Sequence, residues 1–156
     1  MSGPIVRCWS VGGFEGLGTR ELHDILRLRV DVFVVEQNCP YPELDGLDLE
    51  AIHVVGKLAD NTVVAYCRIL PPQKDGLPHI GRVVVPTEYR GQGLGKELMN
   101  EALQVLRLNF GSERSAIAAQ AHLQKFYADF GYVVTGPEYL LDGIPHVDME
   151  LRIVQP

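Results

Sequence analysis

A strand that runs into three closely spaced glycines carries the clearest chemical signal in this sequence. The stretch reads Val83-Val84-Val85-Pro86-Thr87-Glu88-Tyr89-Arg90-Gly91-Gln92-Gly93-Leu94-Gly95-Lys96 and leads into a long helical pattern. Glycines let backbone N–H groups approach a ligand without a Cβ atom in the way. The free N–H groups and the dipole of a helix start attract anions, and Arg90 and Lys96 add positive charge. The loop therefore predicts a cradle for a phosphate or pyrophosphate, with a plain glycine-rich turn as the alternative.

The spacing of this loop argues against two common nucleotide-binding motifs. A P-loop requires G-x-x-x-x-G-K-[ST], but Arg90 stands at the first glycine position and Glu97 at the Ser/Thr position. A dinucleotide fingerprint requires G-x-G-x-x-G, whereas Gly91, Gly93 and Gly95 alternate. We therefore expect neither a P-loop NTPase nor a Rossmann dehydrogenase, and a site for some other nucleotide phosphate is a weaker alternative.

The five histidines are the side chains best suited to acid–base chemistry near neutral pH. His53, His79 and His146 lie on or beside predicted strands, where each is either a base or a structural residue. His23 and His122 fall in predicted helices, and we expect no catalytic role for them.

The cysteine pattern argues against several kinds of site. Cys8, Cys39 and Cys67 are scattered and include no C-x-x-C pair, so they predict neither a disulfide framework nor a zinc cluster. The sequence also has no H-E-x-x-H motif and no G-x-S-x-G motif. We therefore expect no metal site and no serine hydrolase, and the cysteines suit a reducing cytoplasm.

The composition is that of a globular protein with an acidic balance. The chain has 156 residues, of which 46% are hydrophobic, and 14 Lys and Arg against 20 Asp and Glu give a formal net charge of −6. This balance argues against general binding to nucleic acid or to an anionic membrane. No apolar run is long enough to span a bilayer, and the first residues lack the pattern of a signal peptide. These features predict a cytoplasmic protein.

Periodicity predicts alternating strands and helices in one domain, residues 1–156. The coarse order is β-α-β-β-β-α-β-α-β-β, which favours a mixed sheet with helices on its faces. The expected strands and helices cover residues 5–11, 19–36, 52–58, 62–70, 80–85, 91–110, 115–119, 122–130, 132–134 and 146–153.

Several stretches together resemble one enzyme family. Arg90-Gly91-Gln92-Gly93-Leu94-Gly95 looks like the [RQ]-x-x-G-x-[GA] acyl-CoA motif of the GNAT superfamily of N-acetyltransferases. The order of elements matches that fold, and residues 119–132 resemble its next strand–helix unit. Residues 28–41, 45–48 and 142–146 resemble the ElaA-like branch. The resemblance covers most of residues 20–150.

The resemblance implies an α/β fold with a mostly antiparallel central sheet and helices on both faces. It also implies a site for acetyl-CoA, as co-substrate and without a metal, at a V-shaped split between two central strands. The implied CoA-binding residues are Val83, Val84, Val85, Arg90, Gly91, Gln92, Gly93, Leu94, Gly95, Lys96, Gln120, Leu123 and Phe126.

The chemistry at the thioester requires a neutral amine and a proton for the departing thiolate. By resemblance, Tyr127 lies beside the sulfur and is the general acid, whereas a core aromatic residue is the alternative. His146, His79 and Glu36 are candidates for the base, and a water relay is a further possibility. Because the amine attacks directly, no cysteine nucleophile is needed.

Acidic residues gather in residues 36–50 and 138–150, which contain no Lys or Arg. By resemblance both stretches lie on the acceptor side, where they would attract a cationic amine such as a polyamine, a lysine side chain or an amino sugar. The alternative is ordinary turn and surface chemistry. The candidate substrate-binding residues are Phe33, Glu36, Asp45, His53 and His146.

Two classes of function follow from these residues. The first is an N-acetyltransferase that moves an acetyl group from acetyl-CoA to a small-molecule or peptide amine. The second is a non-catalytic acyl-CoA-binding module or sensor with the same cradle. Homodimer formation is open, since related proteins often dimerise.

Overall fold

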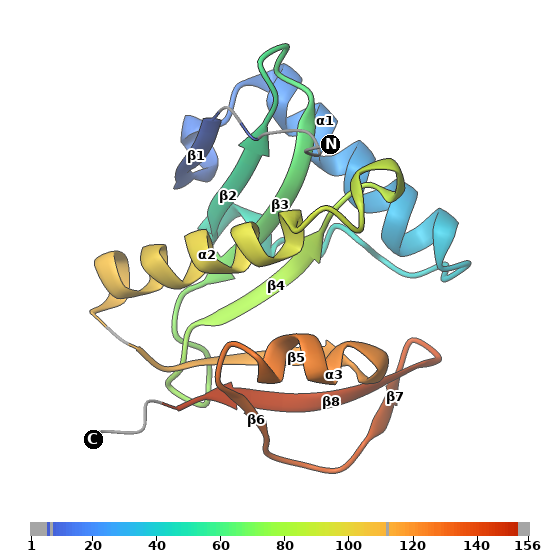
Figure 1. Ribbon diagram of the computed structural model, residues 1–156, viewed down its shortest axis with the longest axis vertical. Helices are drawn as coiled ribbons and strands as arrows, with labels where there is room; N and C mark the ends of the chain where they lie inside the picture. The colour runs from blue at the N-terminus through green and yellow to red at the C-terminus, as the bar shows by residue number, and fades with distance from the viewer. Residues whose placement is uncertain (1–5, 7, 112, 153–156) are drawn as a thin grey trace.

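The computed structural model describes residue 6, residues 8–111 and residues 113–152. It contains one sheet of eight strands with helices packed against it (Figure 1). The strands and α-helices are β1 (Cys8–Gly13), α1 (Thr19–Val30), β2 (Ile52–Lys57), β3 (Val63–Leu70), β4 (His79–Val84), α2 (Leu94–Phe110), β5 (Ser115–Gln120), α3 (Gln124–Ala128), β6 (Tyr132–Val134), β7 (Tyr139–Leu141) and β8 (Ile144–Leu151).

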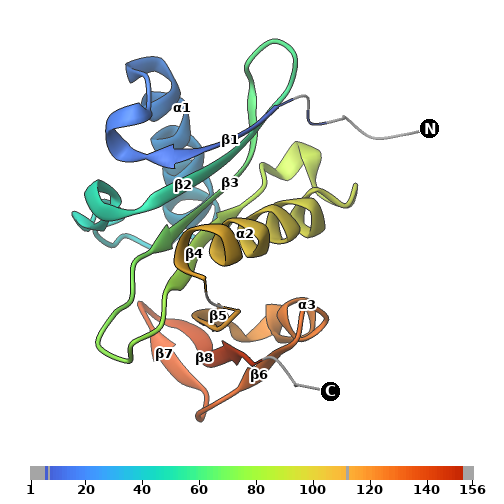
Figure 2. The same cartoon turned by 90° about the vertical axis from the view of Figure 1, so that its left-hand side faces the viewer.

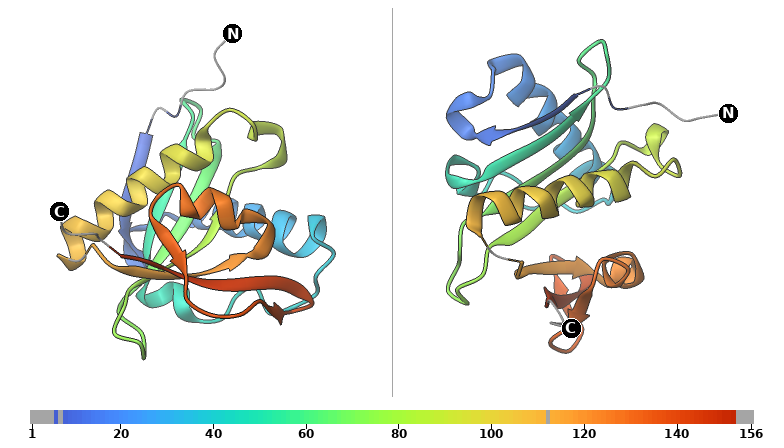
Figure 3. Two further views of the ribbon diagram at one scale, coloured as in Figure 1. Left: turned by 60° about the horizontal axis from the view of Figure 1, so that its bottom comes forward. Right: turned by 60° about the vertical axis from the view of Figure 1, so that its left-hand side comes forward.

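The sheet consists of two groups of antiparallel strands. Its order is β1-β2-β3-β4-β5-β8-β6, and β7 also pairs with β8. Every pairing is antiparallel except that of β4 with β5, the two central strands. Strands β1 to β4 with α2 form one group and β5, β8 and α3 form the other (Figure 3).

Apolar residues alternate along the strands, so that the sheet packs against helices on both faces. Val54 and Ala65 belong to the core under α2, which contributes Leu98 and Ala102. Their sequence neighbours Val55 and Tyr66 face the other way and pack against Ile25 and Leu28 of α1. Figure 2 shows α1 and α2 on opposite sides of β2 to β4. The expected α/β fold, with helices on both faces of a mostly antiparallel sheet, is confirmed.

The first helix changes from α-helical to π-helical hydrogen bonding near its C-terminal end. α1 continues into a π-helical segment, Asp31–Glu36. The N–H of Gln37 donates to the carbonyl of Val32 at 3.2 Å, a bond between residues five apart. π-Helical turns are frequent at functional sites, and this one ends at the edge of the cavity described below.

The remaining differences from the predicted elements are local. The sequence predicts no strand at Tyr139–Leu141, which pairs with β8 as β7. The predicted helices 91–110 and 122–130 begin three and two residues later, at Leu94 and Gln124. Part of residues 5–11 and residue 153, which ends the last predicted strand, lie outside the described residues. Within the described residues, no helix combines the length and apolar character needed to cross a membrane.

Candidate active site

A cavity of about 1170 Å³ opens where β4 and β5 separate. The two strands are in register only at His79 and Ala116, near the start of each. Beyond that point their backbones leave room between them, and Val83, Val85 and Ile117 line the cavity. The split expected from the resemblance is therefore present.

A bulge in β4 lies beside this cavity. Tyr66 of β3 pairs with Val84, while Arg68 pairs with Gly81, so β4 carries one extra residue. Arg82 within the bulge has φ +52°, which a residue with a Cβ atom rarely adopts. Bulges of this kind re-aim a strand and are common next to active sites.

The glycine-rich loop forms one end of the cavity. Gly91 and Gly93 have φ +78° and +82°, and a Cβ atom added to either would meet nothing within 4 Å. Glycine is required here by backbone conformation, and the open space leaves room for a ligand. Gly95 lies in the first turn of α2, where a Cβ atom would touch the Phe126 ring at 3.4 Å.

The side chain of Arg90 turns away from the loop toward the first helix. Its Nη1 donates to Oε2 of Glu36 at 2.7 Å, and its Nε donates to the carbonyl of Val85 at 2.9 Å. Glu36 also accepts from Oγ1 of Thr87 at 2.6 Å. The hydrogen bonds from Arg90 and Thr87 hold the pKa of Glu36 below its ordinary value. Glu36 is therefore an ionised, fully engaged carboxylate, which weakens its case as the base.

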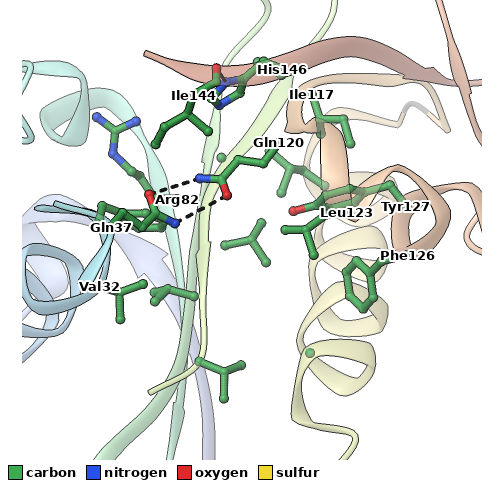
Figure 4. Close-up of a pocket in the computed structure, with 18 of the residues that line it drawn as sticks. Val32, Gln37, Arg82, Ile117, Gln120, Leu123, Phe126, Tyr127, Ile144 and His146 are labelled. Carbon is green, nitrogen blue, oxygen red and sulfur yellow. Dashed lines mark hydrogen bonds between the residues drawn. The ribbon is translucent and has the colours of Figure 1, made fainter. Parts of the chain in front are cut away.

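The opposite wall is built by α3 and the segment before it. Leu123, Phe126 and Tyr127 line the cavity, and Figure 4 shows the Tyr127 hydroxyl directed into it. Phe126 and Tyr127 meet edge to face with ring centroids 5.1 Å apart. Burial raises the pKa of Tyr127. The phenol is consequently protonated at neutral pH, as a proton donor must be.

His146 of β8 is held in a defined tautomer. Its Nδ1 lies 2.7 Å from the carbonyl oxygen of Ile144, and its ring stacks against Tyr139 with a centroid separation of 6.1 Å. Because a carbonyl oxygen only accepts, Nδ1 carries the proton of the neutral ring and Nε2 keeps its lone pair. His146 lines the cavity, so the lone pair of Nε2 is available there to accept a proton.

His79 stands at the start of β4, also along the cavity. Its Nε2 lies 2.8 Å from Oδ2 of Asp75 in the preceding loop. Because an ionised carboxylate only accepts, Nε2 carries the proton of the neutral ring and Nδ1 keeps its lone pair. His79 therefore stays a second candidate for the base beside His146.

Two glutamines face each other across the split. Nε2 of Gln37 donates to Oε1 of Gln120 at 3.4 Å, and Nε2 of Gln120 donates to Oε1 of Gln37 at 3.2 Å. We call this pair the amide clasp (Figure 4). It joins the end of the π-helical segment to the end of β5.

Three arginines neutralise the acidic residues of the loop before β2. Arg29 of α1 is fully buried and pairs with Glu43 at 2.7 Å and with Asp48 at 2.8 Å. Arg68 pairs with Asp45 and Asp48, and Arg82 with Glu43 and Asp45. Burial alone would raise the pKa values of Asp45 and Asp48, but these arginines lower them. Together with the Arg90–Glu36 pair, these arginines engage four of the five carboxylates in residues 36–50 and offset most of the negative charge inferred there.

Most predicted site residues meet in this cavity. Two do not line it, namely Gln92 and His53. His53 is 1% exposed, with Nδ1 2.7 Å from the Tyr66 hydroxyl and Nε2 2.9 Å from the carbonyl of Asp48. Both ring nitrogens are thus occupied in the core. The lining residues that were predicted are Phe33, Glu36, Asp45, His79, Val83, Val84, Val85, Arg90, Gly91, Gly93, Leu94, Gly95, Lys96, Gln120, Leu123, Phe126, Tyr127 and His146.

Comparison with known proteins assigns the family. The family described as acetyltransferase (GNAT) domain matches residues 31–153. The chain belongs to the GNAT acetyltransferase family. It is 42% identical to the protein ElaA of Escherichia coli over 142 residues, which are 89% of this chain and 92% of ElaA. The expected membership, including the ElaA-like branch, is confirmed.

Solved structures agree with this assignment. An acyl-CoA N-acyltransferase from Pseudomonas aeruginosa superposes with a TM-score of 0.88 at 42% identity, covering 93% of this chain and 99% of that chain. The crystal structure of E. coli ElaA gives a TM-score of 0.86 at 38% identity, with 93% and 99% covered. This GNAT protein is an N-acetyltransferase-type enzyme, and its family acts with acyl-CoA on amine acceptors.

Sequence reasoning missed several residues of this GNAT site. Gln37, Arg68, Arg82 and Ile144 line the cavity but were given no role from the sequence. Gln37 and Ile144 lie in the stretches 28–41 and 142–146 that resemble the ElaA-like branch, and this resemblance was the available signal. Arg68 and Arg82 lie in apolar strands, where a charged residue at a buried position was a usable hint, because such residues are almost never buried without a partner. Among the described residues, no group of three or more His, Cys, Asp or Glu is placed to hold a metal ion.

Proposed function

We propose that this protein transfers the acetyl group of acetyl-CoA directly to a primary amine, without a covalent enzyme intermediate, and that the whole chain is one catalytic domain. The observation that carries the proposal is that a proton donor and a proton acceptor line one cavity that also contains the glycine-rich loop. Tyr127 offers its hydroxyl, and His146 offers Nε2.

Acetyl-CoA is the acyl-donor substrate, and the residues present fit it. The open space around Gly91 and Gly93, with the N-terminus of α2 and Lys96, suits the pyrophosphate. The backbone of Val83 and Val85 borders the split, where the extended pantetheine arm could pair with it. Leu123 and Phe126 supply an apolar opposite wall.

The transfer needs two proton movements, and the chain supplies a group for each. His146 Nε2 takes a proton from the attacking amine as the nitrogen bonds to the acyl carbon. The bond between that carbon and sulfur then breaks, and the Tyr127 hydroxyl gives its proton to the departing sulfur. The proton held by His146 restores the Tyr127 hydroxyl through solvent, so both residues return to their starting state.

The acceptor is a primary amine. Glu36 and Asp45, two of the carboxylates that line the cavity, are paired with arginines, so these two give a positively charged acceptor little attraction. The cytoplasm is the proposed compartment, which suits the free thiols of Cys8, Cys39 and Cys67.

An amine panel with acetyl-CoA, followed by thiol release, tests this function. Tyr127→Phe should lower kcat by about a hundredfold while leaving the affinity for acetyl-CoA within about twofold. Unchanged turnover would remove Tyr127 from the mechanism. Binding of acetyl-CoA without acetyl transfer to any amine would instead favour a sensor.

A further inference from the structure

The amide clasp lies within the cavity, between two groups of its lining residues. In the view of Figure 4 the paired amides of Gln37 and Gln120 lie between Arg82, Ile144 and His146 on one side and Val32 and Phe126 on the other. The region around the first group, which we call the acceptor side, contains the proposed base. The region around the second group, the thioester side, leads to the glycine-rich loop.

Hydrogen bonds and strand pairing hold the backbone at both glutamines of the clasp. Gln37 ends the π-helical segment through its N–H bond to Val32, and its neighbour Glu36 is held by Thr87 and Arg90. Gln120 ends β5, where it is paired in register with His146 of β8. The clasp can therefore open by rotation of the two glutamine side chains alone.

The clasp itself is weak. Its two hydrogen bonds join neutral groups at 3.2 and 3.4 Å, longer than the usual 2.9–3.0 Å for such bonds. Both side chains are only partly buried, so water can replace each bond when the pair opens. Neither amide is left unsatisfied in either state, and the clasp can open and close at small cost.

A closed clasp has a chemical consequence for an acyltransferase. A base placed beside a bound thioester can activate water as well as an amine. Water would then bond to the acyl carbon, the bond to sulfur would break, and acetate and the CoA thiol would be released. Keeping His146 apart from the thioester until an acceptor arrives suppresses this loss.

We propose that the amide clasp is a gate between the base and the thioester, which stays closed over bound acetyl-CoA and opens when the acceptor amine enters. This inference rests on the proposed function. It assigns Gln37 and Gln120 a role in acceptor-dependent access rather than in holding the cofactor.

Variants that weaken the gate provide the first test. Gln37→Ala and Gln120→Ala should each raise thiol release from acetyl-CoA without an acceptor by about threefold to tenfold. The Gln120→Ala/His146→Ala double variant should return this hydrolysis to the wild-type level, because the base that activates water is gone. Gln104→Ala, an exposed glutamine on α2, is the matched control and should change nothing.

A variant that strengthens the gate provides the second test. The Gln37→Glu/Gln120→Lys double variant replaces the neutral pair with an ion pair, whose charge-assisted hydrogen bonds are roughly twice as strong. It should lower acceptor-dependent kcat by about tenfold while the Kd for acetyl-CoA stays within about threefold. The two single variants report any effect of charge alone.

A simple structural brace predicts the opposite pattern. The gate would be overturned if the alanine variants only raised the KM for acetyl-CoA and the Gln37→Glu/Gln120→Lys variant kept the wild-type kcat and KM. Unchanged hydrolysis in Gln37→Ala and Gln120→Ala would overturn it as well. Failure of the wild-type protein to bind acetyl-CoA would overturn the proposed function first, and direct binding measurements separate these cases.

Discussion

Arg90 and Glu36 form an ion pair, 2.7 Å from Nη1 to Oε2, that joins the glycine-rich loop to the end of the first helix across 54 residues of sequence. Arg90 is the first residue of the acyl-CoA motif, yet its side chain contacts protein rather than open space. The pair fixes the loop against the π-helical segment and leaves the cradle to Lys96 and backbone N–H groups.

Glu36→Gln should have a small effect on the reaction. The side chains of Arg90 and Glu36 are each about 40% exposed, and ion pairs at such exposure contribute about 0–1 kcal/mol to stability. The KM for acetyl-CoA should therefore rise by no more than about fivefold. The pH–rate profile should keep its shape above the ordinary pKa of a glutamate, about 4.3, because Arg90 and Thr87 hold the pKa of Glu36 below its ordinary value. Asp31→Asn, on the same segment but paired with Arg27, is the control. Loss of one limb of the profile in Glu36→Gln would restore Glu36 as the base.

His146→Ala should lower kcat by about 10²- to 10⁴-fold, the usual contribution of a general base. Added imidazole should recover part of the activity, since the side chain leaves a space open to the cavity. His23→Ala, an exposed position on α1, should behave like the wild type. His79→Ala gives the decisive comparison: if it loses turnover while His146→Ala keeps it, His79 is the base.

Gly93→Ala should weaken acetyl-CoA binding more than it weakens the fold. A residue with a Cβ atom at φ +82° costs about 1–2 kcal/mol. The added methyl group also stands in the space intended for the pyrophosphate, so the Kd should rise by at least about tenfold. Gly16→Ala, where φ is not positive and a Cβ atom again meets nothing within 4 Å, is the control for calorimetric binding. Equal losses of stability and affinity in Gly93→Ala would argue against a cradle.

Asp48→Asn should destabilise the protein by about 3–5 kcal/mol, because it leaves buried Arg29 and Arg68 without one of their carboxylate partners. Urea unfolding at neutral pH measures this loss. Asp129→Asn, exposed at the end of α3, should stay within about 0.5 kcal/mol of the wild type.

The same substitution should change the dependence of stability on pH. Arg29 and Arg68 lower the folded-state pKa of Asp48 below its unfolded value of about 3.9. The stabilisation is therefore complete above about pH 4 and is lost as the pH falls through the folded pKa. The difference between wild type and Asp48→Asn should shrink below about pH 4, and a difference that stayed constant would show that Asp48 is not ionised in the folded protein.

The sequence determined the features that depend on local backbone conformation. Gly91 and Gly93 mark a loop with positive φ values before a helix, and the apolar period of residues 94–106 specifies which face of that helix is buried. These features can be read because a turn or an amphipathic helix is encoded by residues next to one another. The family resemblance added the expectation that Tyr127 is the general acid.

Only the tertiary structure decided which groups meet. Gln37 and Gln120 are 83 residues apart, and Arg29 and Asp48 are 19 apart, so strand register and helix packing bring them together. Residues 36–50 contain no arginine and suggested an open negative surface, whereas three arginines from α1, β3 and β4 pair with Glu43, Asp45 and Asp48. Long-range pairing also buried His53 and left His146 at the cavity. The sequence shows only that both residues are histidines, whereas their difference depends on which polar atoms the fold places around each ring.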